Sequence, residues 1–166
     1  MKKFILTAAL LTITAWSSYG VEIKLFNAVK KTSPVKQTAF TADGEICRLF
    51  FRLAPDAPAD FAINSIYIFA DQDRNTGRKG IGNEYYFDIP KAMISTYTAD
   101  GKGTLHRKAV TAQRDGEWYT VTFPAKLCAG NPLQEFEVVF HTTKGKSDRS
   151  ILRGNAAETI ELPAAK

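Results

Sequence analysis

The fold is decided by residues 66–89, IYIFADQDRNTGRKGIGNEYYFDI, in which a polar, glycine-rich loop joins two strand-like runs. The first and last five residues of this stretch are rich in the β-branched and aromatic side chains that suit a pleated sheet. The loop between them places short oxygen-bearing side chains at alternate positions, in Asp71, Asp73 and Asn75. Its glycines let the backbone curl back and present carbonyl oxygens. The stretch therefore predicts two strands joined by a loop with the chemistry of a hard-cation site.

Calcium takes six to eight oxygen ligands, and D-x-D-x-N is how an EF-hand loop begins. The loop is not an EF-hand, because Thr76 replaces the invariant glycine, Gly82 replaces the bidentate glutamate, and strands flank it. Glu84 lies two positions further along, and a longer glycine-rich loop can return it to the same ion. The expected calcium ligands are Asp71, Asp73, Asn75 and Glu84, with backbone carbonyls near Arg78 and Gly80. The alternative is a solvated hairpin tip, since Asp, Asn and Gly are also turn residues.

This arrangement resembles a segment shared by DOMON-like and family 9 carbohydrate-binding-module-like β-sandwich domains. In those domains a D-x-D-x-x-x-x-T-G loop precedes a G-x-D-Y strand, and some members bind calcium there. Here T-G follows the second aspartate sooner, and Glu84 takes the place of the customary aspartate. Residues 115–127 resemble the family's tryptophan-bearing strand, with W-x-x-x-x-x-P-x-x-L starting at Trp118. The resemblance spans residues 66–127 and implies a β-sandwich more directly than it implies an activity.

The first 20 residues predict a secretory signal peptide. Lys2 and Lys3 form a basic start, residues 4–16 are apolar, and residues 18–20 are a small-x-small cleavage site. No later run is long enough for a membrane-spanning helix. The predicted cleavage point has no cysteine, so a lipid anchor is not expected. We therefore expect a mature domain over residues 21–166 without a transmembrane segment, located in the periplasm or secreted.

The composition favours one β-domain. The chain has 22 basic and 17 acidic residues, a formal net charge of +5, which falls to +3 without the two signal lysines. The basic residues are scattered rather than gathered in a stripe, so nucleic acid is not an expected partner. Short strand-like runs separated by turn signals, with no sustained helical periodicity, predict an antiparallel immunoglobulin-like or jelly-roll-like β-sandwich of eight to ten strands.

Cys47 and Cys128 are the only cysteines. An even pair in an exported protein predicts a disulfide. Two buried free thiols are the alternative, because Cys47 shares an apolar strand face with Leu49 and Phe51. Neither cysteine belongs to a C-x-x-C or Cys/His cluster, so zinc is not expected.

Catalytic chemistry has little support in the sequence. A nucleophilic enzyme needs an activated Ser or Cys beside a His, and neither His106 nor His141 lies in such a motif. The carboxylates outside the loop fall in turns or on outward strand positions, without the paired arrangement of a glycosidase. We therefore do not expect an enzyme. The resemblance adds a haem-binding alternative, since some DOMON domains hold haem with Met and His, and Met93, His106 and His141 are available.

Strand alternation places Phe50, Tyr86 and Trp118 outward. Such aromatics beside Arg and Asp side chains can stack a sugar ring and hydrogen-bond its hydroxyls. For Trp118 the alternative is packing under a covering loop. The expected function is an exported, non-catalytic, calcium-stabilised module that binds carbohydrate or another cell-surface polymer. The alternative is an envelope structural or protein-interaction module in which the metal loop only stiffens the fold.

Overall fold

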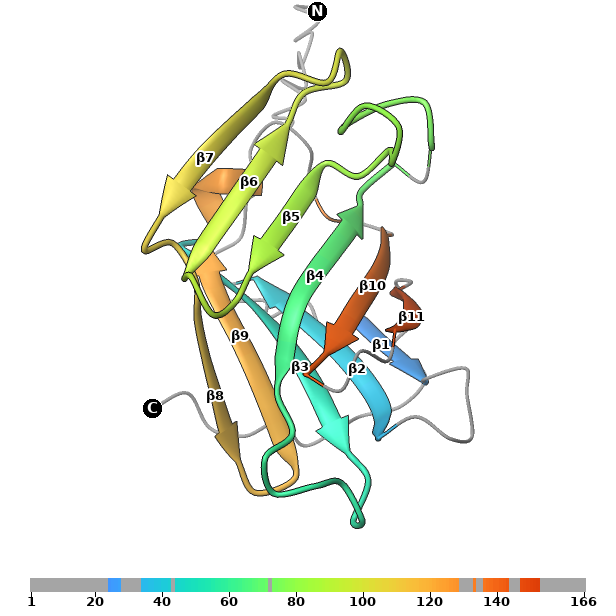
Figure 1. The fold of residues 1–166 in the computed structure, drawn as a ribbon, viewed down its shortest axis with the longest axis vertical. Helices are drawn as coiled ribbons and strands as arrows, with labels where there is room; N and C mark the ends of the chain where they lie inside the picture. The colour runs from blue at the N-terminus through green and yellow to red at the C-terminus, as the bar shows by residue number, and fades with distance from the viewer. Residues whose placement is uncertain are drawn as a thin grey trace, which may run out of the picture.

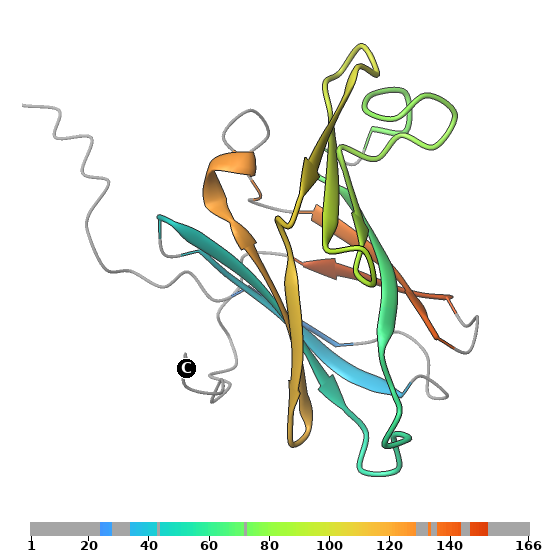
Figure 2. The same ribbon diagram turned by 60° about the vertical axis from the view of Figure 1, so that its left-hand side comes forward.

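The chain folds into two antiparallel β-sheets packed face to face (Figures 1 and 2). The computed structural model describes residues 24–27, 34–42, 44–71, 73–128, 133, 136–143 and 147–152. The predicted signal peptide and the predicted mature start at Val21 lie outside these residues. None of the helical segments in the described ranges is long and apolar enough to cross a membrane.

The first sheet has five strands in the order β1-β2-β3-β9-β8. Their bounds are β1 Lys24–Asn27, β2 Val35–Ala42, β3 Ile46–Leu53, β8 Thr111–Asp115 and β9 Trp118–Pro124. A 3-10 helix, η1 (Ala125–Cys128), follows β9 directly. Pro124 ends the strand because it has no N–H to donate to a further ladder.

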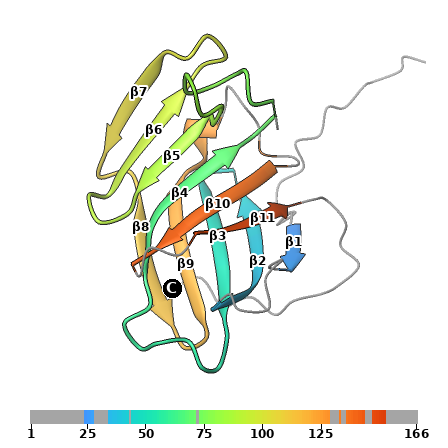
Figure 3. The same ribbon diagram turned by 45° about the vertical axis from the view of Figure 1, so that its right-hand side comes forward.

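The second sheet has six strands in the order β11-β10-β4-β5-β6-β7 (Figure 3). Their bounds are β4 Ile63–Phe69, β5 Tyr85–Asp88, β6 Met93–Tyr97, β7 Gly103–Arg107, β10 Phe136–Thr142 and β11 Ser147–Leu152. The two runs predicted on either side of the acidic loop are β4 and β5, which pair antiparallel with Tyr67 opposite Tyr86. The predicted antiparallel β-sandwich is confirmed.

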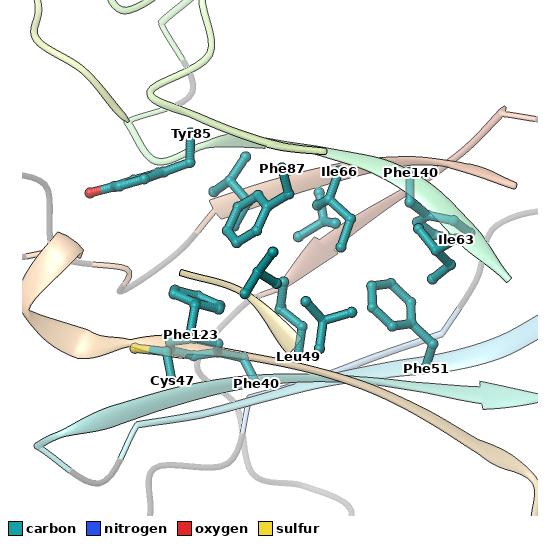
Figure 4. Packing of buried hydrophobic residues seen from close by; sticks show 14 of the residues in the cluster. Phe40, Cys47, Leu49, Phe51, Ile63, Ile66, Tyr85, Phe87, Phe123 and Phe140 are labelled. Carbon is teal, nitrogen blue, oxygen red and sulfur yellow. The ribbon is translucent and has the colours of Figure 1, made fainter. Parts of the chain in front are cut away.

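The core lies between the sheets, where inward-pointing apolar side chains of both sheets pack together (Figure 4). Phenylalanines meet across the two layers: the ring centroids of Phe51 and Phe140 are 5.1 Å apart, and those of Phe87 and Phe123 are 5.0 Å apart. Both pairs have edge-to-face geometry, which aromatic rings prefer in a packed core. The period-2 alternation seen in the sequence therefore produces one continuous apolar layer.

The disulfide predicted from the cysteine count is not present in the structure. Cys47 on β3 and Cys128 at the end of η1 are both buried and are not joined by a disulfide. The hydrogen bond with Cys47, together with burial, raises the pKa of the Cys128 thiol, although a hydrogen bond with Tyr85 acts in the opposite direction. The two cysteine side chains are therefore neighbours in the core. An even count indicated that they would be close but did not determine whether they would be bonded.

Candidate functional site

The acidic loop, residues 71–84, connects the end of β4 to the start of β5 and coils closely on itself (Figure 1). Gly77 has a φ of 68°, and a Cβ there would lie 2.5 Å from the carbonyl oxygen of Asn83. Gly82 has a φ of 79°, and a Cβ there would lie 2.5 Å from the backbone of Arg74. Both positions require glycine, because the backbone has a positive φ and because a Cβ would clash with the neighbouring backbone. The glycines thus allow the loop to bring its two ends together.

Three acceptor oxygens converge on the hydroxyl of Thr76. Its Oγ1 lies 2.7 Å from Asp71 Oδ2, 3.1 Å from Glu84 Oε1 and 3.0 Å from the backbone carbonyl oxygen of Asp73. A hydroxyl has a single proton, so it can donate to only one of these three oxygens. The group is therefore rich in oxygen lone pairs and short of protons, and such a donor set suits a hard cation.

Glu84 is the buried member of this cluster, with 2% of its surface exposed. Its Oε2 accepts a hydrogen bond of 2.7 Å from the N–H of Ala70, which fixes the carboxylate at the base of the loop. Burial raises the pKa of Glu84, and the negative charge of Asp71 raises it further. The hydrogen bonds from Ala70 and Thr76 act in the opposite direction. A proton or a cation at this carboxylate would relieve the unfavourable buried charge.

The predicted ligands Asp73 and Asn75 behave differently. Asp73 Oδ1 accepts hydrogen bonds from the backbone N–H of Asn75 at 2.9 Å and from its side-chain amide at 2.8 Å. Both side chains are exposed. The structure therefore brings Asp71 and Glu84 together, adds the carbonyl of Asp73, and leaves the side chains of Asp73 and Asn75 bonded to each other. Sequence reasoning missed Thr76, whose only signal was its place in the T-G motif.

Within the described ranges, no three His, Cys, Asp or Glu side chains form a group arranged to hold a metal ion. A cation in the acidic loop would have to combine two carboxylates with hydroxyl and carbonyl oxygens. A further acceptor lies at the base of the loop: Asn83 Oδ1 is buried and has no hydrogen-bond partner in the described structure. Its Nδ2 donates to the carbonyl of Tyr85 at 2.9 Å. The residues present thus fit an oxygen-binding cation such as calcium.

Two arginines of the acidic loop contact aromatic rings on the outer face of the six-stranded sheet. The guanidinium of Arg74 lies 3.5 Å from the ring centre of Phe69 and forms an ion pair with Glu137, which also pairs with Arg149 at 3.1 Å. The guanidinium of Arg78 lies near the rings of Tyr86 and Tyr97. The loop therefore lies against the sheet face rather than projecting from it.

Three tyrosines on neighbouring strands line this outer face beside the loop. The ring centres of Tyr67 on β4 and Tyr86 on β5 are 4.9 Å apart. Tyr97 on β6 lies over Gly103, where a Cβ would come within 2.8 Å of its ring. The guanidinium of Arg78 is 5.7 Å from the ring centre of Tyr86 and 6.0 Å from that of Tyr97. We call Tyr67, Tyr86, Tyr97 and Arg78 the tyrosine face.

The three predicted ligand-binding aromatics do not form one surface. Each faces outward as expected, but Phe50 and Trp118 belong to the five-stranded sheet, whereas Tyr86 belongs to the other sheet. The rings of Phe50 and Trp118 pack edge to face with centroids 6.2 Å apart, and the exposed fractions of these two residues are 4% and 7%. Phe50 and Trp118 are therefore buried against each other, and only Tyr86 of the predicted set belongs to the tyrosine face. Strand alternation determines the direction of a side chain but not the sheet to which it belongs.

The structure does not gather the residues of the haem alternative. Met93 and His141 lie on the outer face of the six-stranded sheet, with β4 and β5 between their strands. His141 packs against Tyr67 with ring centres 5.4 Å apart and hydrogen-bonds to Ser147 at 2.7 Å. His106 lies on β7 opposite the buried Ile94, and its Nε2 is 3.1 Å from the hydroxyl of Thr96. Each of the three side chains thus has separate neighbours.

Comparison of the chain with protein-family models, curated proteins and solved structures finds no match. The resemblance to DOMON-like and family 9 binding-module-like domains therefore stays a prediction from the sequence motifs. The chemistry of the site follows from its own residues, which are an oxygen-rich loop and an adjoining aromatic face.

Proposed function

We propose that the protein is an exported, non-catalytic binding module with two linked parts. A calcium ion in the acidic loop stabilises the fold, and the tyrosine face beside the loop binds a carbohydrate or another cell-surface polymer. One observation carries this proposal: the loop that gathers Asp71, Thr76 and Glu84 also supplies Arg78 to the tyrosine face.

The acidic loop has the chemistry of a calcium site. Asp71 and Glu84 would supply the charge, with Thr76 and the Asp73 carbonyl as neutral oxygen ligands. A bound divalent cation would neutralise the repulsion between the two carboxylates and stabilise the loop. Magnesium should stabilise it less, because its small octahedral shell fits a long, glycine-rich loop poorly.

The tyrosine face has the chemistry of a sugar-binding surface. Tyr67, Tyr86 and Tyr97 are each half-buried, so they are held by packing and still present part of their surface to solvent. Burial raises the pKa of Tyr86, which keeps its phenol neutral and able to donate a hydrogen bond. An amphipathic ring of this kind offers an apolar face to a sugar and a polar group to its hydroxyls.

The test is a glycan array probed with the purified protein, with and without calcium. Tyr86→Ala should abolish binding, whereas Tyr86→Phe should retain part of it because the ring stays in place. Melting temperatures measured in parallel confirm that each variant folds. Glycan binding that is unchanged in Tyr86→Ala would contradict the assignment of this face. A calcium response without binding to any glycan would favour the alternative of a structural or protein-interaction module.

A further inference from the structure

Arg78 occupies a distinctive position in the tyrosine face. Its backbone is fixed by the tight end of the acidic loop, where its N–H donates to the carbonyl of Asn83 at 2.8 Å and its carbonyl accepts from Gly82 at 2.8 Å. Its guanidinium lies near the rings of both Tyr86 and Tyr97. The cation therefore lies near two aromatic rings and extends from a backbone position that is hydrogen-bonded within the loop.

Outside the acidic loop, three carboxylates on the strands and turns of the same sheet already have cationic partners. Asp88 pairs with Lys91 at 2.8 Å, and Asp100 pairs with Lys102 at 3.0 Å. Glu137 pairs with both Arg74 and Arg149. Arg78, in contrast, forms no ion pair with any carboxylate in the part of the chain that the structure describes. Among the four residues of the tyrosine face, Arg78 therefore carries the only formal charge, and that charge is positive.

We propose that Arg78 makes the tyrosine face selective for acidic carbohydrates, meaning sugars that carry a carboxylate or a sulfate. This inference rests on the proposed function. The sugar ring stacks on Tyr86 and Tyr97, and its anionic group pairs with the guanidinium of Arg78. Arginine suits this role because its planar fork binds carboxylate and sulfate oxygens in a bidentate manner and also stacks on aromatic rings.

The spacing of the tyrosines suits an extended ligand. Tyr67, Tyr86 and Tyr97 come from β4, β5 and β6, which are successive strands of one sheet. Neighbouring strands lie about 4.8 Å apart, so the three side chains span on the order of 10 Å across the sheet. An oligosaccharide lying across the strands would meet several rings and the single cation of Arg78. The face therefore fits a segment of an acidic polysaccharide better than an isolated anion.

The experiment compares wild-type protein with Arg78→Gln and Lys79→Gln on an array of neutral, uronic-acid-bearing and sulfated oligosaccharides. The two variants remove the same charge at adjacent positions, but only Arg78 lies against the tyrosines. The strongest acidic binder is then titrated beside its methyl ester or desulfated form, which removes only the charge of the sugar. Wild type and Lys79→Gln should bind the charged form at least about tenfold more tightly, and Arg78→Gln should lose that preference.

The outcomes separate this inference from the proposed function. One outcome would overturn only the acidic preference. In it, wild type binds charged and uncharged sugars with equal affinity, Arg78→Gln binds them unchanged, and Tyr86→Ala loses binding. The proposal of a sugar-binding tyrosine face would then remain. An equal loss of preference in Lys79→Gln would also overturn it, because general surface charge would then be responsible. No binding to any oligosaccharide would overturn both proposals. Melting temperatures of the two variants, expected to match wild type, verify that folding is intact.

Discussion

The hydroxyl oxygen of Thr76 lies 3.1 Å from Oε1 of the buried Glu84. The same hydroxyl lies 2.7 Å from Asp71 Oδ2, so one proton is shared among more acceptors than it can satisfy. This arrangement links the electrostatics of the loop to the stability of the fold, because the buried carboxylate is unfavourable when charged and uncompensated.

The first prediction concerns calcium and Glu84. Calcium should raise the melting temperature of wild-type protein and a chelator should lower it, because a ligand of the native state at a hundredfold excess over its Kd adds about 2.7 kcal/mol. Glu84→Gln should lose this response. Without calcium it should melt at a temperature no lower than wild type, since a neutral amide carries no buried charge. Differential scanning calorimetry measures both effects.

Asp88→Asn is the matched control, because it removes a carboxylate from β5, the strand that follows Glu84, outside the acidic loop. It should keep the full calcium response. If Glu84→Gln responds to calcium as strongly as Asp88→Asn does, the ion does not bind through Glu84.

The second prediction is a pH dependence. Burial raises the pKa of Glu84 in the folded state above its ordinary value of 4.5. The folded state therefore binds the proton more tightly, and this contribution to stability is fully present below pH 4.5 and is lost as the pH rises through the raised pKa. Calcium competes with that proton, so its affinity should increase over the same range.

Calorimetric titrations at about pH 5 and about pH 7.5 should show weaker calcium binding at the lower pH. Calcium-free melting curves of Glu84→Gln should lack the part of the pH dependence that Glu84 supplies. Identical calcium-free pH profiles for wild type and Glu84→Gln would show that this carboxyl is not the responsible group.

The strand alternation in the sequence predicted much of the fold. Cys47, Leu49 and Phe51 face the core, and Phe50 and Trp118 face away from it, as a period of two residues requires. Alternation is local, however, whereas sheet membership depends on pairing between distant strands. For this reason the sequence did not reveal that Phe50 and Tyr86 lie on different sheets.

The acidic loop shows the same division between local and long-range information. The D-x-D-x-N pattern indicates where the acidic loop lies in the sequence. The length and glycine content of the loop predict that Glu84 returns to the neighbourhood of Asp71. The hydrogen bond between Thr76 and Asp71 depends on the positive φ of Gly77, because this glycine lets the chain turn immediately after the threonine. The sequence did not indicate that Arg78 lies beside tyrosines, because those tyrosines come from the paired strands β5 and β6.

The third prediction tests the geometry of the loop with two glycines. Gly77→Ala and Gly80→Ala both place a side chain at positive φ, which costs about 1–2 kcal/mol. A Cβ at Gly77 would also lie 2.6 Å from Glu84 Oε1, whereas nothing lies within 4 Å at Gly80. Gly77→Ala should therefore destabilise the protein more in urea unfolding and should weaken calcium binding. Equal effects of the two substitutions would contradict the close approach seen at Gly77.

The fourth prediction concerns the buried thiols. Cys128 has a raised pKa because of its hydrogen bond with Cys47 and its burial, so little reactive thiolate forms near neutral pH. A thiol reagent should react slowly with the native protein and should label both cysteines once the chain is denatured. The measurement is a colorimetric thiol titration without reductant. A denatured protein that shows no reactive thiol would instead contain the disulfide.

The last prediction separates packing from binding at Trp118. The ring is 7% exposed, packs edge to face on Phe50 and lies 5.9 Å from the guanidinium of Arg52. Trp118→Ala should lower the free energy of unfolding by about 3–5 kcal/mol, as expected for a large aromatic removed from a packed site. Trp118→Phe should lose less of the free energy of unfolding and should bind glycans as wild type does. Tyr86→Ala, on the opposite outer face, should show the reverse pattern, with lost binding and a smaller loss of stability than Trp118→Ala. Denaturant unfolding measures the change in stability, and the glycan array measures binding. If Trp118→Ala kept its stability but no longer bound glycans, the ligand site would have to be assigned to the five-stranded sheet.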